Sequence, residues 1–510
     1  MPLVATAAVV PLYVLWTAVL ATGGGDLAAQ DAWAGFAARH PSSAYNLFWY
    51  GGMHTANYSL LSPPLMAWFG VRAVTVVSGL ASTWCAARLL ERTRIGRPLW
   101  PALLASAALW CDVASGRTTF ALGVAFGLAA CLAAAGERRD RPAAAAVLST
   151  LATTASPVAG LFLLVAAAGC LLSRQYGRAA ALALPPVVVV GLTTLLFPFR
   201  GEQPMFAGRI WPPALFGLAV LVLAPRRWRV LRLGSAVYAA GVVLTYLVPS
   251  PVGTNVERLA ELMAPAVLLA AAMAPGPSRP RRAALVVALA LSVNWVAQKT
   301  ADDLRVSTTV PAWAADTEGV VAALHRLGAD RTRVEVVPAR DHREASGLAP
   351  HVNAARGWNR QLDVERGRLF YDGSFSPAAY RAWLDDAAVG FVVLHDGRPD
   401  GPAEREAAFV RGGPAWLEPV WGDAHWRVYR VRDAVPLVSA PASVVRFDDA
   451  GLVVRVTRPG PVTVRIAYSP WLWPDRGCLA PAGRWTRLDV PAAGEYRLSS
   501  RYRLPWHRRC

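Results

Sequence analysis

The chain has 510 residues, of which 54% are hydrophobic and only 17% charged, a composition that excludes an ordinary soluble protein. Its net charge of +18 suggests a nucleic-acid partner unless the charges follow another rule. Residues 1–298 hold 22 arginines and 9 acidic residues, whereas residues 299–510 hold 30 basic and 25 acidic ones. Because the excess is scattered among short polar breaks of the apolar half, we predict no nucleic-acid binding.

Eleven apolar stretches follow one another from the N-terminus to residue 297, and we predict that they insert into a membrane. The stretches are 3–21, 66–90, 99–113, 118–135, 143–155, 158–173, 179–197, 210–225, 235–249, 257–274 and 283–297. The stretches 143–155 and 158–173 are shorter than the roughly 20 residues of a full crossing. Two crossings and one half-inserted pair both stay open, and both return the chain to the same side.

Arginines in the polar breaks alternate as the preference of positive charge for the cytoplasmic side requires. With a cytoplasmic N-terminus, sixteen lie on the inner side: Arg88, Arg92, Arg94, Arg97, Arg138, Arg139, Arg141, Arg174, Arg178, Arg226, Arg227, Arg229, Arg232, Arg279, Arg281 and Arg282. Six lie on the outer side: Arg39, Arg72, Arg117, Arg200, Arg209 and Arg258. We therefore predict a multi-pass protein of the plasma membrane whose C-terminal region is extracytoplasmic.

The loop 22–63 is the longest break within residues 1–298. Glycines at its start end the first membrane helix, and Asp26 has the residue type of an N-cap for a new helix running to about Arg39. On this helix Asp26, Gln30 and Trp33 share one face, whereas Asp31 points away. A carboxylate at the membrane surface can accept a proton from an incoming hydroxyl as a general base, although a capping role alone also explains Asp26.

The end of the same loop, residues 49–58, reads WYGGMHTANY. Aromatic rings stack on sugars, a Gly-Gly pair permits close backbone approach, and Asn and His bond hydroxyl groups. A belt of interfacial aromatic residues would explain the Trp and Tyr but not the glycines or His54. We therefore expect substrate contacts from this loop at Gln30, Tyr50, His54, Asn57 and Tyr58.

The C-terminal region changes character near residue 434. Before it, helical patterns (317–327 and 377–385) mix with short apolar runs (333–337 and 390–395), which predicts a small α/β domain over 299–433. After it, only strand patterns occur, which predicts a β-sandwich over 434–510. The strands are expected at 443–447, 451–457, 462–468, 487–490 and 495–499. Cys478 and Cys510 both fall here, and a bridge between them stays open.

The order of these features resembles the GT-C membrane glycosyltransferases, which use polyprenyl-phosphate-linked sugars. Asp26 just after the first span, the surface helix, the aromatic Gly-Gly segment at 49–52 and the prolines Pro63-Pro64 carry the resemblance. Segments of the C-terminal region resemble actinobacterial cell-envelope proteins of this superfamily: 342–344, 356–363, 370–371, 380–383, 468–471 and 477–478.

The resemblance implies a GT-C-like polytopic α-helical domain over 1–298, with about 11 spans, followed by the extracytoplasmic α/β and β-sandwich regions. It implies an inverting-type transfer of a sugar from a polyprenyl phosphate to a glycan or lipid acceptor of the cell envelope, with Asp26 as the base. A divalent cation stays open as a cofactor, because the second acidic residue of the loop, Asp31, lies off the face of Asp26.

A leaving phosphate needs cations on the outer side, where arginines oppose the topology rule. We predict that Arg258 and Arg117, with the neighbouring Asn255, bind the donor phosphate. Pairing of Arg258 with Glu257 or Glu261, or simple snorkelling to the interface, explains these arginines as well. Asp112 is either a partner of Arg117 or a second acid.

The run 356–363 is the most unusual part of the C-terminal region. We predict that Trp358, Arg360, Gln361 and Asp363 form the acceptor side of the site, although a surface loop with a packed Trp is an equal alternative. Two other functions stay open for the whole chain. A transporter or flippase of lipid-linked sugars would move its substrate without bond transfer, and a non-catalytic envelope scaffold would not need Asp26.

Overall fold

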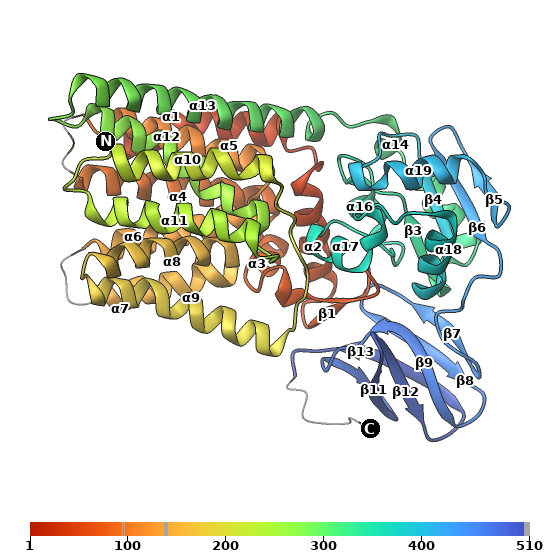
Figure 1. Cartoon of the computed structure of the whole chain (residues 1–510). Coiled ribbons are helices and arrows are strands. Elements are labelled where there is room, and N and C mark those ends of the chain that lie inside the picture. The colour runs from red at the N-terminus through yellow and green to blue at the C-terminus, as the bar shows by residue number, and fades with distance from the viewer. Residues whose placement is uncertain (94, 96, 137–140, 504–509) are drawn as a thin grey trace. The chain divides into compact units, whose positions relative to one another are not determined.

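The computed structural model describes residues 1–93, 95, 97–136, 141–503 and 510, which form two compact units (Figure 1). The helical unit consists of Met1–Thr22 and Ser59–Thr308, and the mixed unit consists of Gly23–Tyr58 and Thr309–Cys510. The loop after the first helix therefore belongs with the C-terminal region, whereas we had expected it within 1–298. Three of the predicted inner arginines, Arg94, Arg138 and Arg139, lie outside the described residues.

Each of the eleven predicted apolar stretches contains a helix in the helical unit. The elements are α1 (Pro2–Leu15) with its π-helical end η1 (Trp16–Leu20), α3 (Ser62–Phe69), α4 (Val71–Arg92), α5 (Leu99–Ala114), α6 (Thr118–Ala134), α7 (Arg141–Ala155), α8 (Pro157–Leu172), α9 (Tyr176–Leu196), α10 (Ala207–Leu223), α11 (Arg229–Leu247), η3 (Gly253–Val256), α12 (Glu257–Met273) and α13 (Arg279–Ser307).

Five of the described helices are long and apolar enough to cross a membrane: Pro2–Leu20, Val71–Arg92, Tyr176–Leu196, Arg229–Leu247 and Arg279–Ser307. Large apolar side chains are exposed on them, as at Leu195 and Leu247, and lipid is the solvent that such a surface requires. The helical unit is thus built like a membrane protein, while the number of crossings stays a prediction.

Two breaks between neighbouring helices have local causes. Gly70, at a φ of 83°, ends α3 and precedes α4, which divides the predicted stretch 66–90. Pro157 is the first residue of α8, where its missing N–H costs no helical hydrogen bond, so the chain turns between α7 and α8. Small residues then bring helices close: a Cβ on Gly123 would lie 2.8 Å from the Cβ of Ala159.

The α/β part of the mixed unit is one sheet with helices on both faces. The sheet has the order β3-β4-β6-β5, in which β3 and β4 are parallel and the other pairs antiparallel. Its strands are β3 (Arg333–Val336), β4 (Val389–His395), β5 (Leu417–Gly422) and β6 (Trp426–Val431). Its helices are α14 (Ala312–Ala315), α15 (Glu318–Arg326), α16 (Arg343–Leu348), α17 (Arg360–Arg366), α18 (Pro377–Asp386) and α19 (Glu404–Arg411), with short 3-10 turns between them.

The alternation of apolar side chains along β4 explains this layering. Phe391 and Val393 pack with α15 and α16 on one face, whereas Val392 and Leu394 pack with α18 and α19 on the other. Side chains of successive strand residues point to opposite faces, and a strand buried on both faces reads as a continuous apolar run. The predicted strands at 333–337 and 390–395 and the predicted helices at 317–327 and 377–385 are all present.

The β-sandwich closes the mixed unit, with its strands in blue in Figure 1. One sheet has the order β10-β13-β8-β7 and the other β11-β12-β9. The strands are β7 (Ala442–Phe447), β8 (Gly451–Val456), β9 (Gly460–Ala467), β10 (Leu472–Pro474), β11 (Cys478–Ala482), β12 (Trp485–Val490) and β13 (Gly494–Ser500). Side chains of both sheets, such as Val454 and Leu488, share one core. The five predicted strands are confirmed, and β10 and β11 were not predicted because both are short and contain proline.

Residues of the first loop complete both parts of the mixed unit. The short strands β1 (Tyr45–Asn46) and β2 (Met53–His54) pair with each other, and Tyr45 and Leu47 enter the sandwich core. The N–H of Ala467 donates to the carbonyl of Gly51 at 2.8 Å. On the other side, the segment at Trp49 pairs with Ala354 beside β3. These backbone hydrogen bonds are the reason that the loop folds with residues 309–510.

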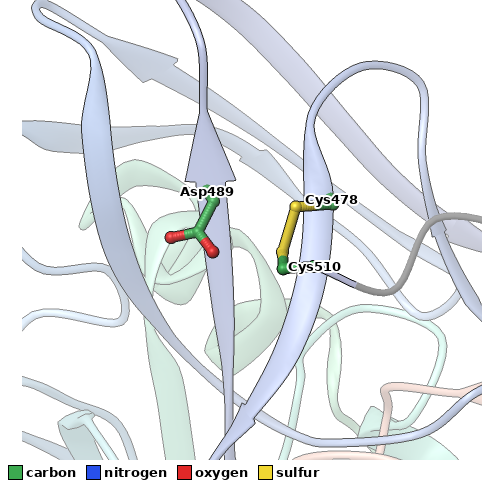
Figure 2. Close-up of side chains that lie close together, drawn as sticks. All are labelled: Cys478, Asp489 and Cys510. Atoms are coloured by element: carbon green, nitrogen blue, oxygen red, sulfur yellow. A yellow bond between two sulfur atoms is a disulfide. The ribbon is translucent and has the colours of Figure 1, made fainter.

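A disulfide joins Cys478 of β11 to Cys510, with 5.2 Å between the two Cα atoms (Figure 2). Asp489 lies on the adjacent strand β12, opposite Cys478 in register. These three side chains are close enough to suggest a metal site, but the sulfur atoms are bonded to each other. Because only thiolates bind metals well, the oxidised pair does not offer such a site.

We expect Cys510→Ser to lower the free energy of unfolding of the β-sandwich by up to about 4 kcal/mol, the loop-closure entropy of a bridge with a sequence separation of 32 residues. The measurement is denaturant unfolding of the full chain in detergent. A reductant should lower the stability of the wild type by a similar amount and leave the variant unchanged. Equal stabilities of wild type and variant under oxidising conditions would contradict a structural role for the bridge.

Candidate active site

Asp26 is the first residue of α2 (Asp26–Arg39), whose bounds match the predicted helix. The N-cap position belongs to Gly25, so Asp26 does not occupy the N-cap position that we expected for it. The half-buried Asp26 lies instead in the first turn, where the N–H groups of the helix favour a negative charge.

Both backbone groups of Gly25 are bound to the C-terminal region. Its N–H donates to the carbonyl of Asp341 at 2.7 Å, and its carbonyl accepts from Nε1 of Trp358 at 3.1 Å. The structure thus brings together two parts of the predicted site, Asp26 and Trp358, that are more than 300 residues apart in the sequence.

The inner face of α2 is packed with aromatic rings. The ring of Trp33, fully buried, contacts Phe36, Phe48 and Trp49, and Tyr58 stacks on it at 5.2 Å between ring centroids. Gln30 is buried on the same helix. Tyr58 and Gln30 therefore contribute to packing within the mixed unit, and their contact with a substrate stays a prediction.

His54 is a buried, neutral histidine. Its Nε2 lies 2.8 Å from Oγ of Ser469, and Nδ2 of Asn57 lies 3.3 Å from its Nδ1. Burial, assisted by the charge of Arg366, lowers the pKa of His54 to about 4. The two predicted contact residues His54 and Asn57 thus bond to each other, and His54 also bonds to Ser469 of the β-sandwich region.

The Gly-Gly pair of the first loop does permit close approach, but to protein groups. A Cβ on Gly52 would lie 2.3 Å from the ring of Tyr45, and one on Gly51 would lie 3.1 Å from the guanidinium of Arg333. Tyr50, which has a φ of 59°, donates its hydroxyl to the carbonyl of Gly357 at 2.6 Å. Packing against residues far away in the sequence therefore explains why glycines and aromatic residues occur together in this segment.

Trp358 is surrounded by polar and charged partners. His342, with a φ of 54°, stacks on its ring with 3.5 Å between centroids, and the guanidinium of Arg360 lies 5.0 Å from the ring. Arg360 also forms an ion pair with Asp400 at 2.7 Å. Gln361 follows on α17 and is half-buried. Side chains of the protein therefore contact the ring of Trp358, and the carboxylate of Asp400 neutralises the charge of Arg360.

Asp363 belongs to a buried ionic cluster rather than to an open surface. Nε and Nη2 of Arg356 donate to its two oxygens at 2.9 and 2.6 Å, and Nη1 of the same arginine donates to Glu406 at 2.9 Å. Burial alone would raise the pKa of Asp363, but Arg356 outweighs it and lowers that pKa. Burial, with Glu406 as a close neighbour, raises the pKa of Glu335 well above its ordinary value. The cluster thus lies in the interior of the α/β part, and Asp363 is buried within it.

In the helical unit, Arg117 lies in a cluster of carboxylates. It contacts Glu261 at 2.6 Å, Asp112 at 3.3 Å and Asp303 at 3.4 Å. Asp112 is therefore a partner of Arg117, one of the two roles expected for it. These side chains meet because α12 packs against both α5 and α13.

Lys299 of α13 is a charged residue of this cluster that sequence reasoning missed. Its ammonium lies 2.5 Å from Glu257 and also contacts Glu261, while Arg209 contacts Glu257 at 3.1 Å. It is the single lysine of the chain, and its place among arginine-rich polar breaks does not distinguish it in the sequence. The sequence did hold a signal for this cluster, namely a pair of charged residues on one face of each of two apolar helices. Glu257 and Glu261 are four residues apart, and so are Lys299 and Asp303.

The other predicted donor residues, Arg258 and Asn255, lie in the same unit, as does the outer-side arginine Arg72. Arg258 of α12 lies with its guanidinium 5.2 Å from the centre of the Phe120 ring. Asn255 is in the turn η3 that leads into α12 and is half-buried. Arg72 donates from Nη2 to the carbonyl of Ala21 at 2.9 Å and so binds the end of the first helix. The residues predicted to bind the donor therefore belong to the helical unit, and the predicted base and acceptor-side residues belong to the mixed unit.

Part of the chain matches a known family, and most of the chain has a structural neighbour. Residues 439–510, most of the β-sandwich, match a family described as a domain of unknown function (DUF8823). No curated protein matches the chain. Among solved structures, the chain is similar to a cryo-EM structure of the arabinofuranosyltransferase AftD from Mycobacteria, with 15% identity and a TM-score of 0.45. The match covers 92% of this chain and 43% of that one, so the chain spans less than half the length of that protein.

The buried carboxyl of Glu335 should make stability depend on pH. Its pKa in the folded chain is raised above the ordinary value of 4.5, so the folded state holds a proton that the unfolded state loses. We expect stability to fall as the pH rises through the raised pKa, with a slope of up to about 1.4 kcal/mol per pH unit. In Glu335→Gln, which has no proton to lose, this contribution should vanish. Unfolding between about pH 5 and about pH 9 measures it.

The exposed Glu404 of α19 provides the matched control. Glu404→Gln should leave the pH dependence as in the wild type. An unchanged slope in Glu335→Gln would show that Glu335 does not hold the proton.

Lys299→Met should destabilise the helical unit, because it leaves two buried carboxylates without the ammonium between them. We expect a loss of about 3–5 kcal/mol, and a smaller loss for Lys299→Arg, which keeps the charge. Thermal unfolding in detergent is the measurement. Arg305→Met on the same helix removes only an exposed pair with Asp302 and should change little. Equal effects of Lys299→Met and Arg305→Met would contradict a buried ionic role for Lys299.

Proposed function

We propose that the protein is an inverting membrane glycosyltransferase of the GT-C type. It moves a sugar from a polyprenyl-phosphate donor to a glycan or lipid acceptor of the cell envelope on the outer face of the plasma membrane. The observation that carries the proposal is the placement of Asp26. This carboxylate begins a helix directly after the first apolar helix, and its N-terminal neighbour is held by two hydrogen bonds from the C-terminal region.

The chemistry needs one base and one group of cations. The acceptor hydroxyl attacks the anomeric carbon while the bond from that carbon to the phosphate oxygen breaks. The hydroxyl proton passes to Asp26, and the electron pair of the broken bond leaves with the polyprenyl phosphate.

Cations for the leaving phosphate are present in the helical unit. Arg117 is the N-cap of α6, Arg258 is the second residue of α12, and Lys299 lies within α13. An ionisable group inside a membrane-type bundle is by default a candidate for a functional site. We assign the donor phosphate to these three residues, with Asn255 beside it. The effect of a metal chelator on activity measures whether a divalent cation takes part.

A transporter of lipid-linked sugars is the second candidate, and the buried ionic cluster at Glu257, Glu261 and Lys299 favours it, because transporters also place ionisable groups inside their bundles. Reconstituted vesicles loaded with a labelled polyprenyl-phosphate sugar separate the two functions. Movement of the lipid without formation of a new glycosidic bond would favour transport.

Asp26→Asn should abolish sugar transfer while leaving membrane insertion intact, because an amide cannot accept the proton of the acceptor. The assay uses purified full-length protein in nanodiscs, radiolabelled polyprenyl-phosphate arabinose, mannose and glucose as donors, and cell-envelope glycan as acceptor. We expect a loss of about 100-fold or more, the usual size of a general-base contribution.

Asp31→Asn is the matched control, since it makes the same chemical change on the same helix but off the face of Asp26. It should keep most of the activity. Transfer by Asp26→Asn at the wild-type rate would overturn the assignment of the base.

A further inference from the structure

We propose that Trp358 is a positioning residue that fixes the catalytic Asp26 through the backbone of Gly25, rather than a platform for the acceptor sugar. The inference rests on the proposed function, since it assumes that Asp26 is the base. It changes the role expected for Trp358 from its place in an unusual polar run.

Gly25 is the point at which Asp26 is held. Its backbone has φ 65° and ψ −139°, a conformation that essentially only glycine adopts. Its N–H and its carbonyl are both bound, to the carbonyl of Asp341 and to the indole N–H of Trp358. Because the N–H and the carbonyl of Gly25 are both held, the direction in which α2 starts is fixed. The position of the Asp26 carboxylate is then fixed as well.

Trp358 can act as an anchor because the residues on both sides of it are themselves anchored. The hydroxyl of Tyr50 donates to the carbonyl of Gly357 at 2.6 Å and accepts from the N–H of Asn359 at 3.0 Å. The side chain of Asn359 in turn caps α17 by accepting from the N–H of Leu362 at 3.1 Å. The path from Tyr50 through Trp358 to Gly25 therefore ties the two ends of the first loop together.

The ring of Trp358 is also poorly suited to binding a sugar. A sugar platform needs an open aromatic face, but His342 stacks on this ring at 3.5 Å with an interplanar angle of 16°. His342 itself has a φ of 54°, which is uncommon for a residue other than glycine. Strained backbone of this kind persists where the surrounding structure needs one side-chain direction, and here that direction places the imidazole on the indole.

Trp358→Phe tests the inference, because it removes the indole N–H and keeps an aromatic ring for His342 to stack on. We expect kcat to fall about 10-fold or more, as for a misplaced catalytic group, while KM for the cell-envelope glycan acceptor stays within about twofold. Amide hydrogen exchange of the full chain in nanodiscs should become faster in the peptide that contains residues 23–30.

Trp383→Phe is the matched control. Its Nε1 donates to the carbonyl of Arg366 at 2.8 Å, so the variant loses the same kind of hydrogen bond at a position away from Gly25. It should change neither kcat nor the exchange of residues 23–30. A Trp358→Phe variant that matches this control in both measurements overturns the inference.

The two proposals fail in different ways. If Asp26→Asn is active, the proposed function is wrong. Faster exchange in Trp358→Phe would still show that the hydrogen bond from Trp358 holds Gly25 in place. If Asp26→Asn is inactive and Trp358→Phe has wild-type kcat and exchange, the base assignment stands and the positioning role is wrong. An increase in KM for the acceptor alone would instead support the original expectation that Trp358 lies on the acceptor side of the site.

Discussion

The mixed unit depends on one short segment of the first loop, residues 45–54, which is hydrogen-bonded to both C-terminal folds. Leu47 donates its N–H to the carbonyl of Asp449, and Gly51 accepts from the N–H of Ala467, so the segment joins the sandwich. Between them, Phe48 accepts from Ala354 beside β3. A buried backbone group must find a partner, and this segment finds its partners some 300 to 400 residues away.

This constraint explains why the segment is rich in glycine and aromatic residues. Gly52 has a φ of 112°, and its missing side chain makes room for the ring of Tyr45, whose hydroxyl donates to Ala467. The same residue types would also suit a sugar site, which is how we interpreted them. Packing and binding use the same chemical properties, namely close backbone approach and flat rings, so composition alone does not separate them.

Local patterns predicted local structure well. The eleven apolar helices, the helix that starts at Asp26 and five strands of the sandwich follow from periodicity, glycine stops and proline turns. What the sequence could not supply is pairing over distance. Arg117 and Glu261 are 144 residues apart, and Lys299 and Glu257 are 42 apart, so neither contact leaves a local signal. For the same reason Trp358 was identified as unusual while its partner Gly25 was not.

The ionic cluster of the helical unit sets a condition on any donor that binds there. Ion pairs among the described residues join three cations to four carboxylates: Arg117, Arg209 and Lys299 to Asp112, Glu257, Glu261 and Asp303. An anionic phosphate that approaches Arg117 must therefore compete with carboxylates that already hold it. In a medium of low dielectric constant such competition is costly, because each displaced carboxylate needs a new partner. Phosphate binding at Arg117 thus requires either that a further cation enters with the donor or that Glu261 moves away from Arg117 while keeping Lys299.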